Sequence, residues 1–200
     1  MQHTMANIVE KFEHAREYQN DVWVADYTEQ TRFEPESAKK GVCVSESEFD
    51  DIKSFHLQNP KHVVIYGVNF EEYPDYFPDK TKNCECLFKP RDVVDGGFLL
   101  LCELKYCRAH NIEANADKAY EQLKSTWSLL ESRQIFDRNH CKSFLNISVP
   151  DHSDKSPFKS FTANQDEELK WLKEYKINLL GENDLLILDK GVVRIPETEI

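Results

Sequence analysis

The first sixty residues carry two helical patterns of apolar positions with a strand pattern between them. Apolar residues at helical spacing predict an amphipathic helix over Met5–Gln19, and a β-prone run predicts a strand over Val22–Tyr27. Ser45 and Glu48 have the spacing of a capping box. This spacing favours the start of a second helix, which should end before Pro60.

Strand patterns dominate the middle of the chain. β-branched and apolar residues predict strands over His62–Val68, Lys82–Lys89 and Phe98–Cys107, with a turn region over Pro90–Gly97. Apolar residues then follow one face of a helix over Asp117–Arg133. The remaining predicted elements are a strand over Ser143–Val149, a loop over Asp151–Ser160, a short helix over Glu167–Tyr175 and a hairpin over Asp184–Ile195.

The order helix, strand, strand, strand, helix, strand predicts an α/β sandwich around a mixed sheet flanked by helices. We expect residues 1–44 to form an N-terminal helical extension packed on a main domain of residues 45–200. No apolar run approaches the ~20 residues of a membrane span, and no signal-peptide pattern opens the chain. We therefore expect a cytoplasmic protein with no membrane partner, whose six cysteines are reduced thiols.

Two charged residues interrupt an otherwise apolar strand. Glu103 and Lys105 lie two positions apart, so they project to the same face of the strand predicted over Phe98–Cys107. Charged groups are rarely placed in a core strand unless they are paired or bound to a metal. In an arbitrary chain a structural ion pair, or the exposed end of the strand, is the more common explanation. The strand predicted over Lys82–Lys89 makes a metal site the better explanation here.

An antiparallel pairing around a turn near Val94–Asp95 makes facing residue numbers add up to roughly 188–190, which places Glu85 or Leu87 opposite Glu103. Side chains that face each other across a sheet are ~5 Å apart, so two carboxylates there repel unless a cation lies between them. Mg²⁺ suits such oxygen ligands. Lys105, on the same face, could stabilise charge on a phosphate or orient an attacking water.

The segments Lys82-Asn-Cys-Glu85 and Phe98-Leu-Leu-Leu-Cys-Glu103-Leu-Lys105 resemble the signature of the PD-(D/E)XK nuclease superfamily, in which an acid on one strand precedes Glu-x-Lys on the next. The resemblance covers about Phe49–Val149. It implies a restriction-endonuclease-like fold with an α-β-β-β-α-β core, metal ligation by Glu85 and Glu103, and a catalytic Lys105. The implied enzyme is a Mg²⁺- or Mn²⁺-dependent endonuclease that hydrolyses phosphodiester bonds, expected to be those of DNA.

Two further residues fall where members of this superfamily carry functional groups. Gln122 lies one turn into the following helix, although a polar residue beside an apolar helix face needs no function. Glu48 falls where some members carry an additional acid, so the resemblance implies a candidate metal ligand there, but its capping-box spacing explains it fully. Glu85 departs from the usual Asp by one methylene, which could move the metal or indicate a decayed site. Asp92 and Asp95 lie at the turn, ~25 Å of strand from the Glu-x-Lys pair, so we exclude them as ligands.

Cysteines provide a rival metal site. The spacing of Cys84, Cys86, Cys102 and Cys107 is not that of the usual zinc knuckles, so buried small hydrophobic roles are favoured. Strand parity predicts that the first three face away from the acids and that Cys107 shares the face of Glu103.

The net charge of −11 argues against tight DNA binding by the isolated chain. A local basic rim is one source of attraction: Lys80, Lys82, Lys89 and Arg91 surround the central hairpin, and Lys105 and Arg108 lie at the far end of its second strand. Ordinary solvated loop charges would explain these residues equally well. We also expect a protein partner or a homo-oligomer to deliver the domain to nucleic acid. The alternative is a catalytically inactive nuclease-fold module that acts as a protein–protein interaction subunit.

Overall fold

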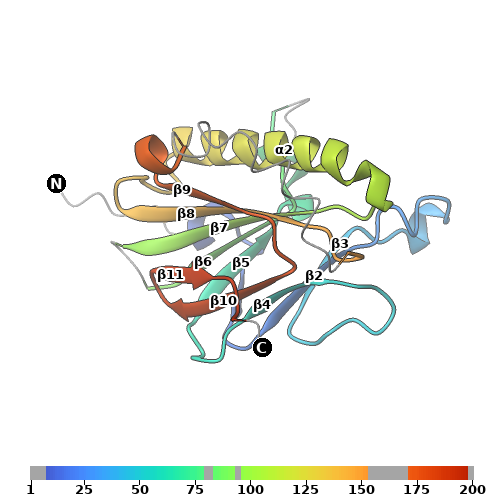
Figure 1. Cartoon of the computed structure of the whole chain (residues 1–200), viewed down its shortest axis with the longest axis horizontal. Helices are drawn as coiled ribbons and strands as arrows, with labels where there is room; N and C mark the ends of the chain where they lie inside the picture. Colours follow the sequence, from blue (N-terminus) through green and yellow to red (C-terminus); the bar gives the residue numbers. More distant parts are fainter. Residues whose placement is uncertain (1–7, 79–82, 93–95, 153–170, 198–200) are drawn as a thin grey trace.

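Two β-sheets and one long helix are stacked in the computed structural model, which describes residues 8–78, 83–92, 96–152 and 171–197 (Figure 1). The central layer is a six-stranded sheet, here called sheet A. The long helix α2 (Ile112–Ser132) lies over one face of sheet A, and a five-stranded sheet, sheet B, covers the other face. The chain is therefore a mixed α/β protein.

Sheet A has the strand order β1-β5-β6-β7-β8-β9. Neighbouring strands from β1 to β7 are antiparallel, whereas β8 runs parallel to β7 and β9 runs parallel to β8. Helix α2 makes the crossover from β7 to β8, as a parallel pair requires. The strands are β1 (Arg16–Tyr18), β5 (Ile65–Asn69), β6 (Cys86–Pro90), β7 (Gly97–Leu104), β8 (Cys141–Ser148) and β9 (Ile177–Leu180).

Sheet B has the order β11-β10-β4-β2-β3 and unites the two ends of the chain. Strand β10 runs parallel to β4, with Leu185 opposite Leu57. Because β2 pairs with both β3 and β4, segments on either side of the domain boundary expected at residue 44 share one sheet. The strands are β2 (Val22–Asp26), β3 (Val42–Ser45), β4 (Phe55–Gln58), β10 (Asp184–Asp189) and β11 (Val192–Arg194).

Short helical segments connect these strands. They are α1 (Ile8–Lys11), the 3-10 turns η1 (Glu36–Ala38), η2 (Phe70–Glu72), η3 (Pro74–Tyr76) and η4 (Ala109–Asn111), and the π-helical turn η5 (Trp171–Tyr175). No helix in the described ranges is long and apolar enough to cross a membrane.

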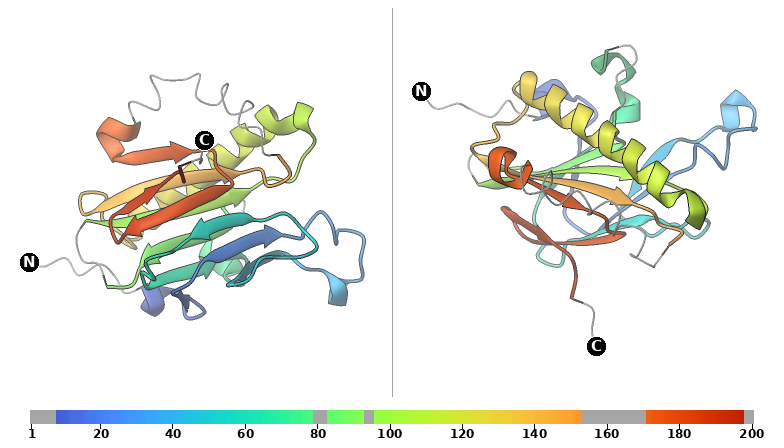
Figure 2. Two further views of the ribbon diagram at one scale, coloured as in Figure 1. Left: turned by 60° about the horizontal axis from the view of Figure 1, so that its bottom comes forward. Right: turned by 45° about the horizontal axis from the view of Figure 1, so that its top comes forward.

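Sheet A lies between α2 and sheet B (Figure 2). It separates two apolar clusters, one under α2 and one between the sheets. On the α2 side, Leu101 and Leu145 pack beneath the helix, and the ring of Trp127 lies 5.4 Å from that of Phe136. Between the sheets, Phe88 and other residues of sheet A meet residues of sheet B. Successive apolar residues of β7 thus belong to opposite clusters, which is why the strand is apolar except at Glu103.

The expected helix over Met5–Gln19 is wrong beyond its first turns. Residues before position 8 lie outside the described ranges, α1 ends at Lys11, and the chain turns so that β1 can pair with β5. Buried Phe12 contacts the ring of Tyr73 at 5.0 Å, which anchors this turn to the core. The helical spacing of apolar residues in this segment therefore reflects the packing of a short helix followed by a strand at the sheet edge.

The helix expected after the Ser45 capping box is also wrong. A loop follows β3, and β4 then places Phe55 and Leu57 inward while His56 and Gln58 are only partly buried. This alternation fits a strand, and pairing of β4 between β2 and β10 overrides the local helix signal.

Other expectations need smaller changes. The structure confirms the strands expected near residues 22–27, 62–68, 98–107 and 143–149 and the C-terminal hairpin, with shifted bounds, whereas β3 and β9 were not expected. Helix α2 begins at Ile112, earlier than expected, because buried Ile112 and Ala116 extend its apolar face. Most of the expected loop and helix between residues 151 and 175 lies outside the described ranges.

Candidate active site

The pairing of β6 with β7 brings Glu85 beside Glu103. Cys86 faces Cys102 and Leu87 faces Leu101, so the expected register is correct where β6 and β7 pair, and Leu87 is not the partner of Glu103. The backbone N–H of Glu85 donates to Cys102 O at 3.1 Å, although Cys86 is the register partner of Cys102. Two consecutive residues of one strand thus oppose a single residue of the other, as in a β-bulge. Glu85 is the extra residue.

The bulge turns the carboxylate of Glu85 toward the strand beside it. Glu85 Oε2 accepts a hydrogen bond from the backbone N–H of Leu104 at 2.9 Å. The next backbone N–H, that of Lys105 just after β7, instead donates to Ser148 O of β8 at 2.9 Å. Glu85 therefore takes the place of a backbone carbonyl at the point where the ladder between β6 and β7 ends.

Glu103, Lys105 and Gln122 form a connected polar group on the α2 side of sheet A. The side chain of Glu103 is 1 % exposed and its Oε1 accepts a hydrogen bond from Lys105 Nζ. The same Nζ donates to Oε1 of Gln122 at 3.0 Å, and Gln122 Nε2 donates to the backbone O of Asn83 at 3.0 Å. Gln122 thus points into the site, and it links Lys105 to the segment that precedes Glu85.

Burial disfavours the charged forms of both carboxylates. Burial, followed by the charge of Glu103, raises the pKa of Glu85 well above its usual value. Burial raises the pKa of Glu103 to about 7, even though the charge and hydrogen bond of Lys105 oppose this shift. A divalent cation bound between them would favour the charged form of both carboxylates.

The donor set fits a divalent cation. Glu103 Oε2 is buried and has no hydrogen-bond partner among the described residues, although a buried carboxylate oxygen normally has one. Within those ranges no group of three or more His, Cys, Asp or Glu side chains is arranged to hold a metal. Two carboxylates remain, and Mg²⁺ is commonly held by one or two carboxylates together with waters and substrate phosphates.

One acid near this site could not be found from the sequence. Asp26, at the end of β2 in sheet B, adds to the effect of burial by raising the pKa of both Glu85 and Glu103. Its Oδ1 accepts a hydrogen bond from the N–H of Thr28 at 2.8 Å. Nothing in the local sequence connects Asp26 with the central hairpin, because only the packing of one sheet on the other brings them together.

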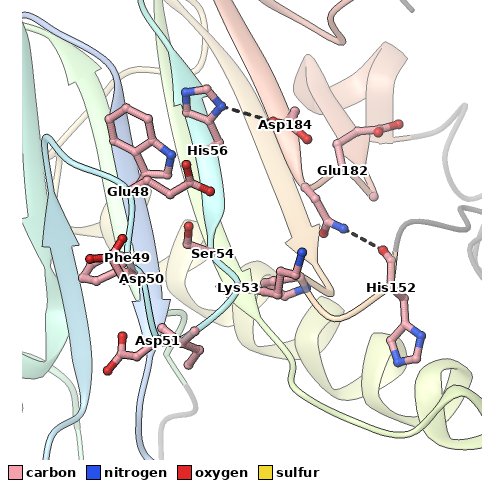
Figure 3. A pocket seen from close by; sticks show the side chains of 15 residues that line it. Glu48, Phe49, Asp50, Asp51, Lys53, Ser54, His56, His152, Glu182 and Asp184 are labelled. Carbon is pink, nitrogen blue, oxygen red and sulfur yellow. Dashed lines mark hydrogen bonds and ion pairs between the residues drawn. The ribbon is translucent and has the colours of Figure 1, made fainter.

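Glu48 lies elsewhere. It is an exposed residue in the loop between β3 and β4, and it lines a pocket of about 680 Å³ along sheet B. Residues 48–54 and 181–184 contribute opposite parts of this pocket (Figure 3). The contacts of Lys105 with Glu103 and Gln122 are instead on the α2 side of sheet A. The structure therefore does not bring Glu48 to the two carboxylates.

The cysteine orientations follow the expected parity except at the bulge. Cys86 and Cys102 lie between the sheets, and Cys107 packs on the α2 side. Cys84 was expected opposite the acids, but it packs on the α2 side because the extra residue at Glu85 reverses the alternation. All six cysteines are free thiols.

The structure does not support Lys89 and Arg91 as members of the expected basic rim. Lys89 is only 6 % exposed, and burial lowers its pKa. Arg91 pairs with Glu17 and with Asp92 at the end of β6 away from Glu85. Asp92 is therefore remote from the site, as expected, whereas Lys80, Lys82 and Asp95 lie outside the described ranges.

Comparisons with known proteins add no assignment to this geometry. No protein-family model matches the chain, and no curated protein or solved structure is detectably similar to it.

Proposed function

We propose that this chain is a metal-dependent nuclease that hydrolyses phosphodiester bonds, with DNA as its substrate. The observation that carries the proposal is the state of Glu103, a buried carboxylate that lies beside the charge of Glu85 and has one oxygen without a hydrogen-bond partner among the described residues. A structural ion pair with Lys105 would account for one oxygen of Glu103, but it leaves the second oxygen and Glu85 unexplained.

The proposed chemistry divides the work among four side chains. Glu85 and Glu103 would hold Mg²⁺ or Mn²⁺, which when bound neutralises charge on a phosphate and lowers the pKa of a bound water. The Nζ of Lys105 is a cation on the same face as Glu103 and would stabilise negative charge on the phosphate. Gln122 keeps that Nζ in place through its Oε1.

The order of elements around the site also supports this function. Glu85 precedes β6, Glu103 lies near the end of β7, and Gln122 lies on the helix that follows β7. This is the arrangement that the resemblance to PD-(D/E)XK nucleases implies, and we therefore propose a restriction-endonuclease-like core for sheet A and α2. In this protein a second sheet, not a helix, covers the other face.

Cation binding provides the first test. Titration of the protein with Mn²⁺ at about pH 8, followed by calorimetry, should show one site or two with wild-type protein. Glu103→Gln should abolish the binding because it removes a ligand charge without changing shape. Glu48→Gln is the matched control, since it removes an exposed acid outside the site, and it should bind Mn²⁺ as the wild type does.

Cleavage provides the second test. Plasmid, single-stranded DNA and RNA are incubated with Mg²⁺, Mn²⁺ or EDTA, and we expect cleavage of DNA that EDTA abolishes. Wild-type protein that binds no Mn²⁺ and cleaves none of these substrates would contradict the proposal. That result would favour the inactive interaction module.

A further inference from the structure

Helix α2 contacts Asn83 and Cys84, which precede β6, through two side chains one helical turn apart. Gln122 Nε2 donates to Asn83 O at 3.0 Å, and Thr126 Oγ1 accepts a hydrogen bond from the backbone N–H of Cys84 at 2.8 Å. Thr126 and Cys84 are both fully buried. The two residues immediately before Glu85 are thus attached to α2 by side chains that project from the same face of the helix.

The bulge explains why the contact with Thr126 is needed. An extra residue at Glu85 interrupts the ladder between β6 and β7, and the N–H of Cys84 then meets a helix instead of a strand. A buried N–H without an acceptor is costly, so a bulge at this position requires an acceptor from α2. The Thr126 hydroxyl is that acceptor. Across the interrupted ladder, the carboxylate of Glu85 accepts a hydrogen bond from the N–H of Leu104.

The residue type supports the same conclusion. Thr126 lies in the middle of α2 on its apolar face, between buried Leu123 and Leu130. Threonine is a poor helix former, and an apolar residue would fill this position without a polar group to satisfy. A hydroxyl is useful here because of the N–H that it accepts.

We propose that Thr126 is a positioning residue for the metal site: it holds the bend at Cys84 and so delivers the Glu85 carboxylate to its place beside Leu104 and Glu103. This inference rests on the proposed function for its consequence in metal binding. The structural part, from Thr126 to the Glu85–Leu104 hydrogen bond, stands without it.

The test compares three variants of the full chain. Thr126→Val keeps the shape and removes the acceptor, and Thr126→Ser keeps the acceptor. Ser143→Ala is the matched control, because it removes a different buried hydrogen bond made by α2, the 2.8 Å bond from Trp127 Nε1 to Ser143 Oγ. If Thr126→Val does not fold, Thr126→Ala replaces it, since it also removes the acceptor.

Two readouts are measured. The first is exchange of the Leu104 amide by NMR, referenced to the Lys105 amide, whose partner Ser148 is on the other neighbouring strand. Thr126→Val should make the Leu104 amide exchange faster than in the wild type while the Lys105 amide stays protected. The second readout is Mn²⁺ affinity, which should fall by about tenfold or more in Thr126→Val, in the range for residues that support metal ligands. Thr126→Ser and Ser143→Ala should resemble the wild type in both.

The outcomes separate this inference from the proposed function. Equal losses of Leu104 protection or of Mn²⁺ affinity in Thr126→Val and Ser143→Ala would overturn it, because Thr126 would then act only through general stability. If wild-type protein binds no Mn²⁺, the proposed function fails and the Leu104 amide decides the inference alone. Unchanged Leu104 protection in Thr126→Val would then overturn it, and selective loss would support it.

Discussion

The carboxylate of Glu85 accepts its hydrogen bond from Leu104, the residue that separates Glu103 from Lys105 in the Glu-x-Lys sequence. The acid from one strand is therefore held by the backbone between the two charged residues of the next strand. The bulge at Glu85 removes this residue from the regular ladder, and the length of a glutamate side chain allows its carboxylate to reach the N–H of Leu104.

Glu85→Asp should consequently weaken the site, although aspartate is the usual residue at this position in the resembling superfamily. The side chain becomes one methylene shorter and can no longer reach Leu104 from the bulge. We expect Mn²⁺ affinity to fall by about tenfold, in the range for disturbed metal-site support. Calorimetry on Glu85→Asp and wild-type protein measures it, and equal or tighter binding by the variant would contradict this reading of the bulge.

Under the proposed function, Glu103→Ala and Lys105→Ala should abolish DNA cleavage, because one removes a proposed metal ligand and the other removes the cation proposed to face the phosphate. Circular dichroism should show that both variants remain folded. Asp95→Ala serves as the control acid from the turn and should cleave at nearly the wild-type rate. Damage to cleavage by Asp95→Ala as large as that by Glu103→Ala, without unfolding, would show that the wrong acid has been assigned.

The stability of the metal-free protein should decrease as the pH rises from about 4.5 to about 7. Burial raises the pKa of Glu103 to about 7, so across this range the folded state holds a proton that the unfolded state releases. The part of this loss that comes from Glu103 has an upper bound of about 3 kcal/mol. Urea unfolding in EDTA at several pH values measures it, and Glu103→Gln should flatten the curve. Parallel curves for Glu103→Gln and the wild type would contradict the assignment.

His56 should stabilise sheet B more at low pH than at high pH. Burial opposes its charge, but its Nδ1 lies 3.2 Å from Asp184 and its Nε2 lies 3.1 Å from Asp21, and these carboxylates raise its pKa overall (Figure 3). This stabilisation is complete below the unfolded pKa near 6.5 and is lost as the pH rises through the folded pKa. His56→Gln should thus cost on the order of 1 kcal/mol more at pH 6 than at pH 8. Equal costs at both pH values would show that His56 is not charged there.

Binding of isolated protein to duplex DNA should be weak, with a Kd of about 1 µM or higher near 200 mM salt. The chain has a net charge of −11, Lys89 is buried, and Arg91 is already paired with acids. Fluorescence anisotropy at about 50 and 200 mM salt measures the affinity and its salt dependence. Nanomolar binding at the higher salt concentration would mean that neither a partner nor oligomerisation is needed.

The central hairpin could be predicted because its information is local. Residue numbers that face each other across a hairpin follow from the position of the turn, and strand parity then places Glu103 and Lys105 on one face. The bulge at Glu85 could not be predicted, because the alternation of apolar residues in the sequence does not show that one residue is extra. The place of Asp26 could not be predicted either, because its position depends on how sheet B packs on sheet A.

The segment from Ser45 to Gln58 illustrates the opposite failure. A capping box is a local signal, but Phe55 and Leu57 lie in a strand because β4 pairs with β2 and β10, which come from distant parts of the chain. Short segments with mixed patterns take the structure that their neighbours impose.

The strand order of sheet B has a consequence for how this protein is made. His56 on β4 and Asp184 on β10 are neighbours in space but 128 positions apart in the chain. During synthesis, β2, β3 and β4 leave the ribosome long before the C-terminal hairpin. The edge of β4 that pairs with β10 therefore stays unpaired while most of the chain is synthesised. Closing so long a loop slows folding, and an unpaired edge can capture another chain in the meantime. Expression at lower temperature, or with a chaperone that shields strand edges, should therefore increase the yield of folded protein.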